Sequence, residues 1–106
     1  MNTEELYLTI GHDSRVLRAN EALCKLIAHP PSKITSRSML DFIYPEDHKT
    51  FVNAFIDIYY GEKGPKKYQF RLLTAHGNQI SVLADFTLKG VQKIPFIDVQ
   101  LSIPVS

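Results

Sequence analysis

Every second residue is apolar in LYLTI at positions 6–10, as in a strand with one buried face. A polar turn, GHDSR, follows it, and VLRA at 16–19 is predicted to return as a second short strand. The pattern then changes, because the large apolar residues of EALCKLIA at 21–28 share one helical face, and Asn20 can cap the start of that helix. The first part of the chain is therefore predicted to be a strand pair followed by a short helix.

A longer helix is predicted in the middle of the chain. The segments PSKIT at 31–35 and RSMLDFI at 37–43 are typical of two short helical turns. From Pro45 onward, large apolar residues recur at spacings of three and four until Tyr59, and Gly61 follows. This is the pattern of an amphipathic helix that ends at a glycine.

Three further segments with alternating apolar residues complete the pattern: KKYQFRLLT at 66–74, QISVLADFTL at 79–88 and FIDVQLSI at 96–103. The first two are joined by AHGN, which is typical of a hairpin turn. Two strands, several helices and three strands predict an α+β domain with a five-stranded antiparallel sheet and helices packed on one face. The predicted core between the long helix and this sheet is formed by Phe55, Ile58, Phe70, Leu72, Val82 and Phe86.

Length and charge narrow the classes of function. The chain has 106 residues, which fits a single domain over 1–106. Because its formal net charge is only +1, the lysines at 63–67 are interpreted as a solvated loop and edge strand, and we expect no direct nucleic-acid partner. The apolar runs are too short to cross a bilayer, and the single cysteine, Cys24, allows no internal disulfide. We expect a cytoplasmic protein, with the nucleus as the alternative compartment, and no membrane partner.

One short stretch, PEDH at 45–48, raises the question of catalysis. Asp47 and His48 could form an acid–base pair, and they define the alternative function, a small-molecule-binding or catalytic α+β domain. However, a proline followed by two acids is also typical of a first helical turn, where the helix dipole stabilises negative charge. The other histidines fall in separate predicted turns. We therefore favour a helix start, and expect neither an enzyme nor a metal site.

The order of these elements and several local motifs resemble a PAS domain. HDSRVLRANEAL resembles that family's aspartate–turn–strand–asparagine segment, LIAHPPSKITSRSMLDFIYPEDHKTF its helical middle with a Pro-Glu-Asp signature, and RLLTAHGNQISV its hairpin. The resemblance covers almost the whole chain. It also has departures: Ser14, Ala28 and Ser36 stand where family members often have glycine, and Tyr44 where many have histidine.

The resemblance implies a role in signalling. PAS domains are sensory and interaction modules, usually not enzymes, that hold a small ligand between helices and sheet, dimerise, or do both. We therefore expect a sensory and dimerisation domain of a signalling or transcription-regulating protein. A ligand pocket in its core would be lined by Met39, Phe55, Leu72, Val82, Asp98 and Gln100.

The same alignment argues against two cofactors of this family. Met39 occupies the place of the photoactive cysteine of flavin-binding members, and Leu72 and Val82 occupy the places of two asparagines that bind the flavin ring. Phe51 stands where one group of haem-binding members has its axial histidine. We expect neither flavin nor haem, and the identity of any small ligand stays open.

Two lines of reasoning disagree about the last strand. Its alternation predicts that Ile97, Val99 and Leu101 face the core. In the PAS alignment, however, Gln100 matches a residue that faces the ligand, which would turn Asp98 and Gln100 inward and the odd-numbered residues outward. We follow the resemblance and predict an outer apolar patch that joins a homodimer or another PAS-type domain. The predicted interface consists of Leu73, Leu83, Ile97, Val99 and Leu101.

Overall fold

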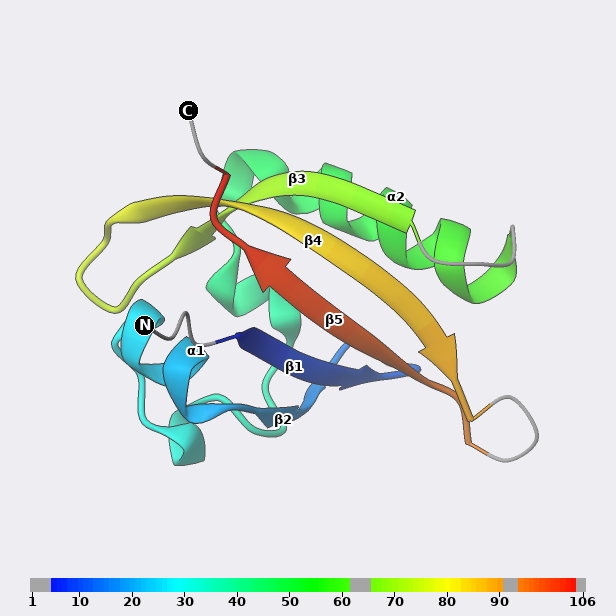
Figure 1. Cartoon of the computed structure of the whole chain (residues 1–106), viewed down its shortest axis with the longest axis horizontal. Helices are drawn as coiled ribbons and strands as arrows, with labels where there is room; N and C mark the ends of the chain where they lie inside the picture. The colour runs from blue at the N-terminus through cyan, green and yellow to red at the C-terminus, as the bar shows by residue number, and fades with distance from the viewer. Residues whose placement is uncertain (1–4, 62–65, 91–93, 105–106) are drawn as a thin grey trace.

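The computed structural model describes residues 5–61, 66–90 and 94–104, and these ranges contain a five-stranded antiparallel sheet. The strand order is β2-β1-β5-β4-β3, so the first and last strands of the chain are neighbours (Figure 1). The predicted α+β class, with an antiparallel sheet and helices, is confirmed. The strands are β1 (Leu6–Gly11), β2 (Val16–Ala19), β3 (Lys66–Leu73), β4 (Gln79–Lys89) and β5 (Phe96–Ser102).

The helices lie between β2 and β3 in the chain. They are α1 (Glu21–Ile27), α2 (His48–Tyr60) and three short 3-10 turns, η1 (Pro31–Lys33), η2 (Met39–Phe42) and η3 (Pro45–Asp47). As predicted, Asn20 caps α1, because its side-chain oxygen accepts a hydrogen bond from the Leu23 N–H at 3.1 Å. Pro45 opens the separate turn η3 and not α2 itself, which begins at His48. No helix in the described ranges is long and apolar enough to span a membrane.

The last strand faces the opposite way from the prediction that followed the resemblance. Val99 lies directly opposite Leu8 of β1 and Phe86 of β4, and opposed residues of a sheet share one face. At most 2% of each of these three residues is exposed. The prediction that Ile97, Val99 and Leu101 form an outer interface is therefore wrong, because all three are buried in the core, as their alternation indicates.

The even-numbered residues of β5 point outward. Gln100 lies opposite Tyr7 of β1 and Asp85 of β4, on the sheet face turned away from α2. Asp98 shares that face, so the prediction that Asp98 and Gln100 line a core pocket is wrong as well. The physical reason is that one residue of error in an alignment moves every side chain of a strand to the other face.

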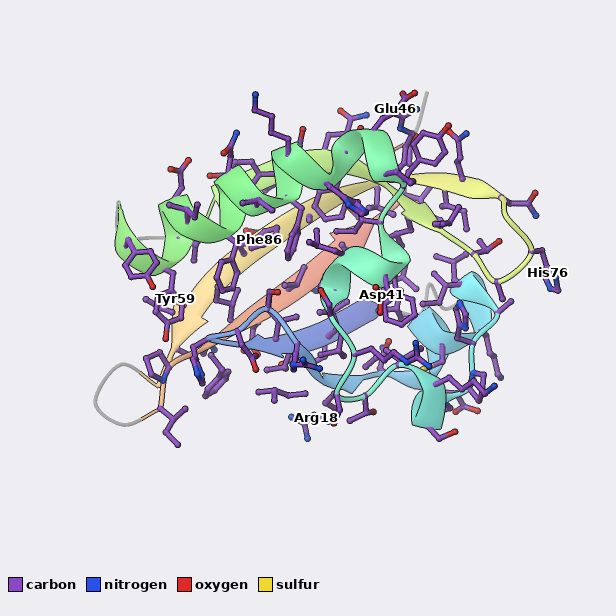
Figure 2. The ribbon with its side chains drawn as sticks, turned by 180° about the vertical axis from the view of Figure 1, so that it is seen from behind. Arg18, Asp41, Glu46, Tyr59, His76 and Phe86 are labelled. Carbon is purple, nitrogen blue, oxygen red and sulfur yellow. The ribbon has the colours of Figure 1, made fainter. Side chains whose placement is uncertain are left out.

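Phe51 is the central aromatic residue between α2 and the sheet. It is 1% exposed, and its ring centroid lies 6.0 Å from those of Phe70 and Phe86. Phe55, one turn later, stacks on Phe51 at 6.2 Å but is only half-buried. Figure 2 shows Phe86 between the helix and the sheet. The remaining predicted core residues are buried as expected: Ile58, Phe70, Leu72, Val82 and Phe86.

Three residues other than glycine adopt a left-handed backbone conformation. Their φ angles are 63° at Ser14, 62° at Ala28 and 72° at Ser36. These are the same three positions at which members of the PAS family often have glycine. Because glycine has no Cβ atom, it adopts positive φ without the steric cost that other residues incur. The chain therefore keeps these turns although it lacks the residue that favours them.

Ala28→Gly is accordingly expected to stabilise the domain by about 0.5–1 kcal/mol, after allowance for the greater freedom of glycine in the unfolded chain. Ala28 follows the last turn of α1, where its N–H donates to the carbonyl oxygen of Lys25 at 3.2 Å. Ala22→Gly, inside the same helix, is the matched control and should destabilise by about 0.5–1 kcal/mol. Urea denaturation of both variants measures the difference, and equal signs would contradict the explanation.

Candidate functional site

The acidic residues at the start of α2 form a structural contact with β3. The carboxylate of Asp47 accepts hydrogen bonds from Nε, Nη2 and the backbone N–H of Arg71, at 2.7, 2.8 and 2.9 Å. Oε1 of Glu46 lies 3.6 Å from Nη2 of Arg71. The centroid of the Tyr44 ring lies 4.5 Å from Cζ of Arg71. These hydrogen bonds hold the pKa of Asp47 below its ordinary value. Asp47 is thus occupied in joining η3 to the sheet.

His48 is held by a different group. Its Nε2 lies 2.8 Å from the carbonyl oxygen of Ile43, in the segment between η2 and η3. Asp47 therefore interacts with Arg71, and His48 interacts with the backbone. The two side chains do not form a pair with each other, and both stabilise the local structure at the start of α2. In the parts of the chain that the structure describes, no three His, Cys, Asp or Glu residues gather as a metal site.

The core between the sheet and the short helices is closely packed in the described part of the chain. A cavity of about 10 Å³ remains between β1, β2, β3 and the helices. That volume is close to the least that can hold one water molecule. Two of the residues predicted for a core pocket, Met39 and Leu72, line this cavity, whereas Val82 is buried elsewhere and Phe55 lies half-buried on α2. The lining consists of Leu8, Val16, Leu23, Ile27, Ile34, Met39, Phe42 and Leu72.

The outer face of the sheet carries a hydrogen-bonded polar group centred on Asp98. Oδ1 of Asp98 accepts hydrogen bonds from the Tyr7 hydroxyl at 2.8 Å and the Thr9 hydroxyl at 3.1 Å. Nζ of Lys89 lies 3.5 Å from its other oxygen. Three strands, β1, β5 and β4, therefore contribute to this group, and each oxygen of Asp98 has at least one polar partner.

An open hollow of about 720 Å³ lies at one end of the sheet, where α1 approaches β1 and the end of β5. Its lining also extends over the outer face of β4 and β3. The apolar part of the lining includes Leu6, Leu26, Leu83, Leu101 and Ile103. The charged and polar part includes Glu5, Lys25, Lys67, Asp85 and Gln100. A second, polar hollow of about 350 Å³ adjoins it and shares Asp85 and Gln100.

This surface differs from the interface predicted from the sequence. Leu83 lies on the outer face and lines the large hollow, and Leu73 is half-buried on the same face. The other three predicted residues are Ile97, Val99 and Leu101. Of these, only Leu101 lines the hollow, and its side chain lies on the core face of the sheet. The prediction missed Leu26 and Asp85. The alternation of β4 does place Asp85 outside, but no sequence pattern places α1 beside β5.

Comparison with solved structures identifies the fold. A PAS domain of an HTR-like protein from Haloarcula marismortui gives a TM-score of 0.80 at 13% identity, over 95% of this chain and 82% of that chain. A PAS domain from a two-component sensor histidine kinase gives 0.75 at 15% identity, over 97% and 87%. The PAS-B domain of Drosophila melanogaster Cycle, with bound ethylene glycol, gives 0.83 at 12% identity, over 93% and 99%.

The chain has the PAS fold. The resemblance inferred from the sequence is thereby confirmed at the level of the fold. No sequence-family model matches the chain, and a comparison with curated proteins finds no match.

Proposed function

We propose that this PAS-fold chain is a sensory and protein-interaction module of a signalling protein. Its solved structural neighbours include a PAS domain from a two-component sensor histidine kinase, which supports a role of this class. We further propose that the module acts through the outer face of its sheet and the adjoining hollow, and that its interior serves mainly as a core.

The observation that carries this proposal is the small volume of the cavity in the core. Small-molecule sites usually have volumes of roughly 300–1,000 Å³, whereas the cavity beside Met39 and Phe42 has about 10 Å³. A ligand there would have to displace side chains that are at most 4% exposed. The expected lack of flavin and haem stays a prediction, as does the cytoplasmic or nuclear compartment.

The proposed partner is a second copy of the chain, or another PAS-type domain, bound non-obligately. The outer face combines apolar Leu83 and Leu73 with polar Tyr7, Asp98 and Gln100. Interfaces of non-obligate complexes have this mixed character, whereas permanent dimers bury a more apolar surface. We therefore expect this mixed surface to bind its partner more weakly than a continuous apolar patch, which the sequence suggested, would bind it.

Leu83→Arg is expected to shift the domain toward monomer in sedimentation velocity experiments at high protein concentration. The substitution introduces a long charged side chain at the half-buried, apolar part of the outer face. Ile56→Arg is the matched control, because Ile56 is 47% exposed on α2, on the other side of the sheet. A parent chain that stays monomeric throughout, or equal effects of the two variants, would contradict the proposed surface.

A further inference from the structure

Asp85 occupies a central position on the outer face of β4. Its side chain lines both the large apolar hollow and the smaller polar one. Its Oδ1 is buried, and no donor in the described part of the chain forms a hydrogen bond with it. A carboxylate with one buried oxygen that lacks a donor is unfavourable, so this position favours a neighbouring positive charge.

The neighbours of Asp85 do not supply this donor. Gln100 lies opposite Asp85 on β5, but its Nε2 donates to Oε1 of Glu5 at 3.1 Å. Lys67 lies opposite on β3, and within the described ranges no carboxylate oxygen lies within 4.0 Å of its Nζ. Asp98, on the next strand, shows the contrast, because two hydroxyl groups and Lys89 surround its carboxylate.

The surroundings of Asp85 also determine the shape of a complementary group. Leu83 is two residues from Asp85 on the same face of β4, and Ile103, after the end of β5, is an exposed apolar residue of the same hollow. The hollow, at about 720 Å³, falls in the range of roughly 300–1,000 Å³ that is usual for small-molecule sites. Such sites are mostly apolar, with a few polar groups that fix the orientation of the ligand.

We propose that this hollow binds an organic cation, with its protonated amine or guanidinium group on Asp85 and its aliphatic or aromatic part against Leu83 and Ile103. Because Oδ1 has almost no accessible surface, the cation donates its charge-assisted hydrogen bond to the other oxygen, Oδ2, and its positive charge stabilises the carboxylate as a whole. This inference goes beyond the proposed function, because it assigns a ligand class to a site on the interaction surface.

The sign of the ligand's charge follows from how far each charged group of the lining is exposed to solvent. Lys25 also lines the hollow, but it is exposed and lies 3.6 Å from Glu21 along α1. Lys67 is exposed as well, so water solvates its charge. Asp85 is the charged residue of this lining whose oxygen is withdrawn from solvent. A cation therefore gains more from the site than an anion of the same size.

The test uses n-octylguanidinium and n-octanoate as probes with the same alkyl length and opposite charge. Each is titrated below its micelle concentration into the isotope-labelled full chain, and the methyl signals of Leu83, Leu101 and Ile103 are followed. The cation is expected to shift these signals saturably, with an affinity about tenfold above that of the anion, which corresponds to one charge-assisted hydrogen bond. Equal affinities, or tighter binding of octanoate, would overturn the assignment.

Two variants test the role of the carboxylate. Asp85→Asn should lower the affinity for n-octylguanidinium about tenfold and leave that for octanoate unchanged or raised. Lys67→Gln should strengthen binding of the cation, because it removes a like charge from the hollow. Unchanged binding in Asp85→Asn with a native-like spectrum, or weaker cation binding in Lys67→Gln, would contradict the proposal.

These results are separable from the test of self-association. A chain that binds the alkylguanidinium through Asp85 but never self-associates contradicts only the proposed partner. A chain that self-associates through Leu83 but ignores the probe contradicts only the ligand class.

Discussion

Phe51→Ala is expected to lower the free energy of unfolding by about 3–5 kcal/mol, a large part of the total stability of a domain of this size. Phe51 is 1% exposed, and its ring packs against the rings of Phe55, Phe70 and Phe86. Truncation leaves a cavity between α2 and the sheet that the surrounding strands cannot close without distortion. Urea denaturation of the purified variant measures the change.

Two neighbours in the same helix are the controls for this prediction. Val52→Ala should change the stability little, because Val52 is 37% exposed. Phe55→Ala should cost less than Phe51→Ala, since Phe55 keeps part of its ring in solvent. If Phe55→Ala cost more than Phe51→Ala, α2 would be rotated relative to the orientation described above.

Val99→Asp is expected to prevent stable folding. Val99 is fully buried between Leu8 and Phe86. A carboxylate there would have to stay unpaired in an apolar core or be protonated, and either state costs several kcal/mol. Circular dichroism and the amide NMR spectrum of the variant report the loss of the folded state directly.

Ser102→Asp is the matched control on the same strand, because Ser102 is exposed and belongs to the even-numbered residues of β5, which point away from the core. This variant should fold like the parent chain. A folded Val99→Asp variant with parental stability and a changed sedimentation coefficient would return Val99 to the outer face, as the PAS alignment predicts.

The alternation of the last strand shows what the sequence can predict unaided. A period of two is a direct consequence of strand geometry, so it assigns Ile97, Val99 and Leu101 to the core correctly. An alignment to a distant family carries no such constraint at the level of one residue. The three solved PAS structures reported above are only 12–15% identical to the chain, and one residue of error reverses the two faces.

The core around α2 shows a second limit. Spacings of three and four define an apolar stripe on a helix, and both Phe51 and Phe55 belong to it. Which of them lies deepest depends on the rotation of the helix over β3 and β4, and that rotation is fixed by contacts such as those of Asp47 with Arg71. Periodicity alone cannot supply this information.

The candidate site was the least predictable part. The hollow exists because β1 and β5 are neighbours and α1 approaches their ends. Contacts between residues about a hundred positions apart in the chain have no signature in local patterns. By contrast, Ser14, Ala28 and Ser36 were noted from the sequence only as departures from the family's glycines, although a position that favours glycine also indicates a left-handed turn.

Methyl NMR spectra recorded over a dilution series of the full chain test most directly whether the domain acts through its outer face. The account predicts that the signals of Leu83 and Ile103, which line the outer hollow, change with concentration. The signals of Leu23 and Ile34, which line the small interior cavity, should stay constant. Changes confined to Leu23 and Ile34, or to the exposed Ile56 of α2, would contradict it.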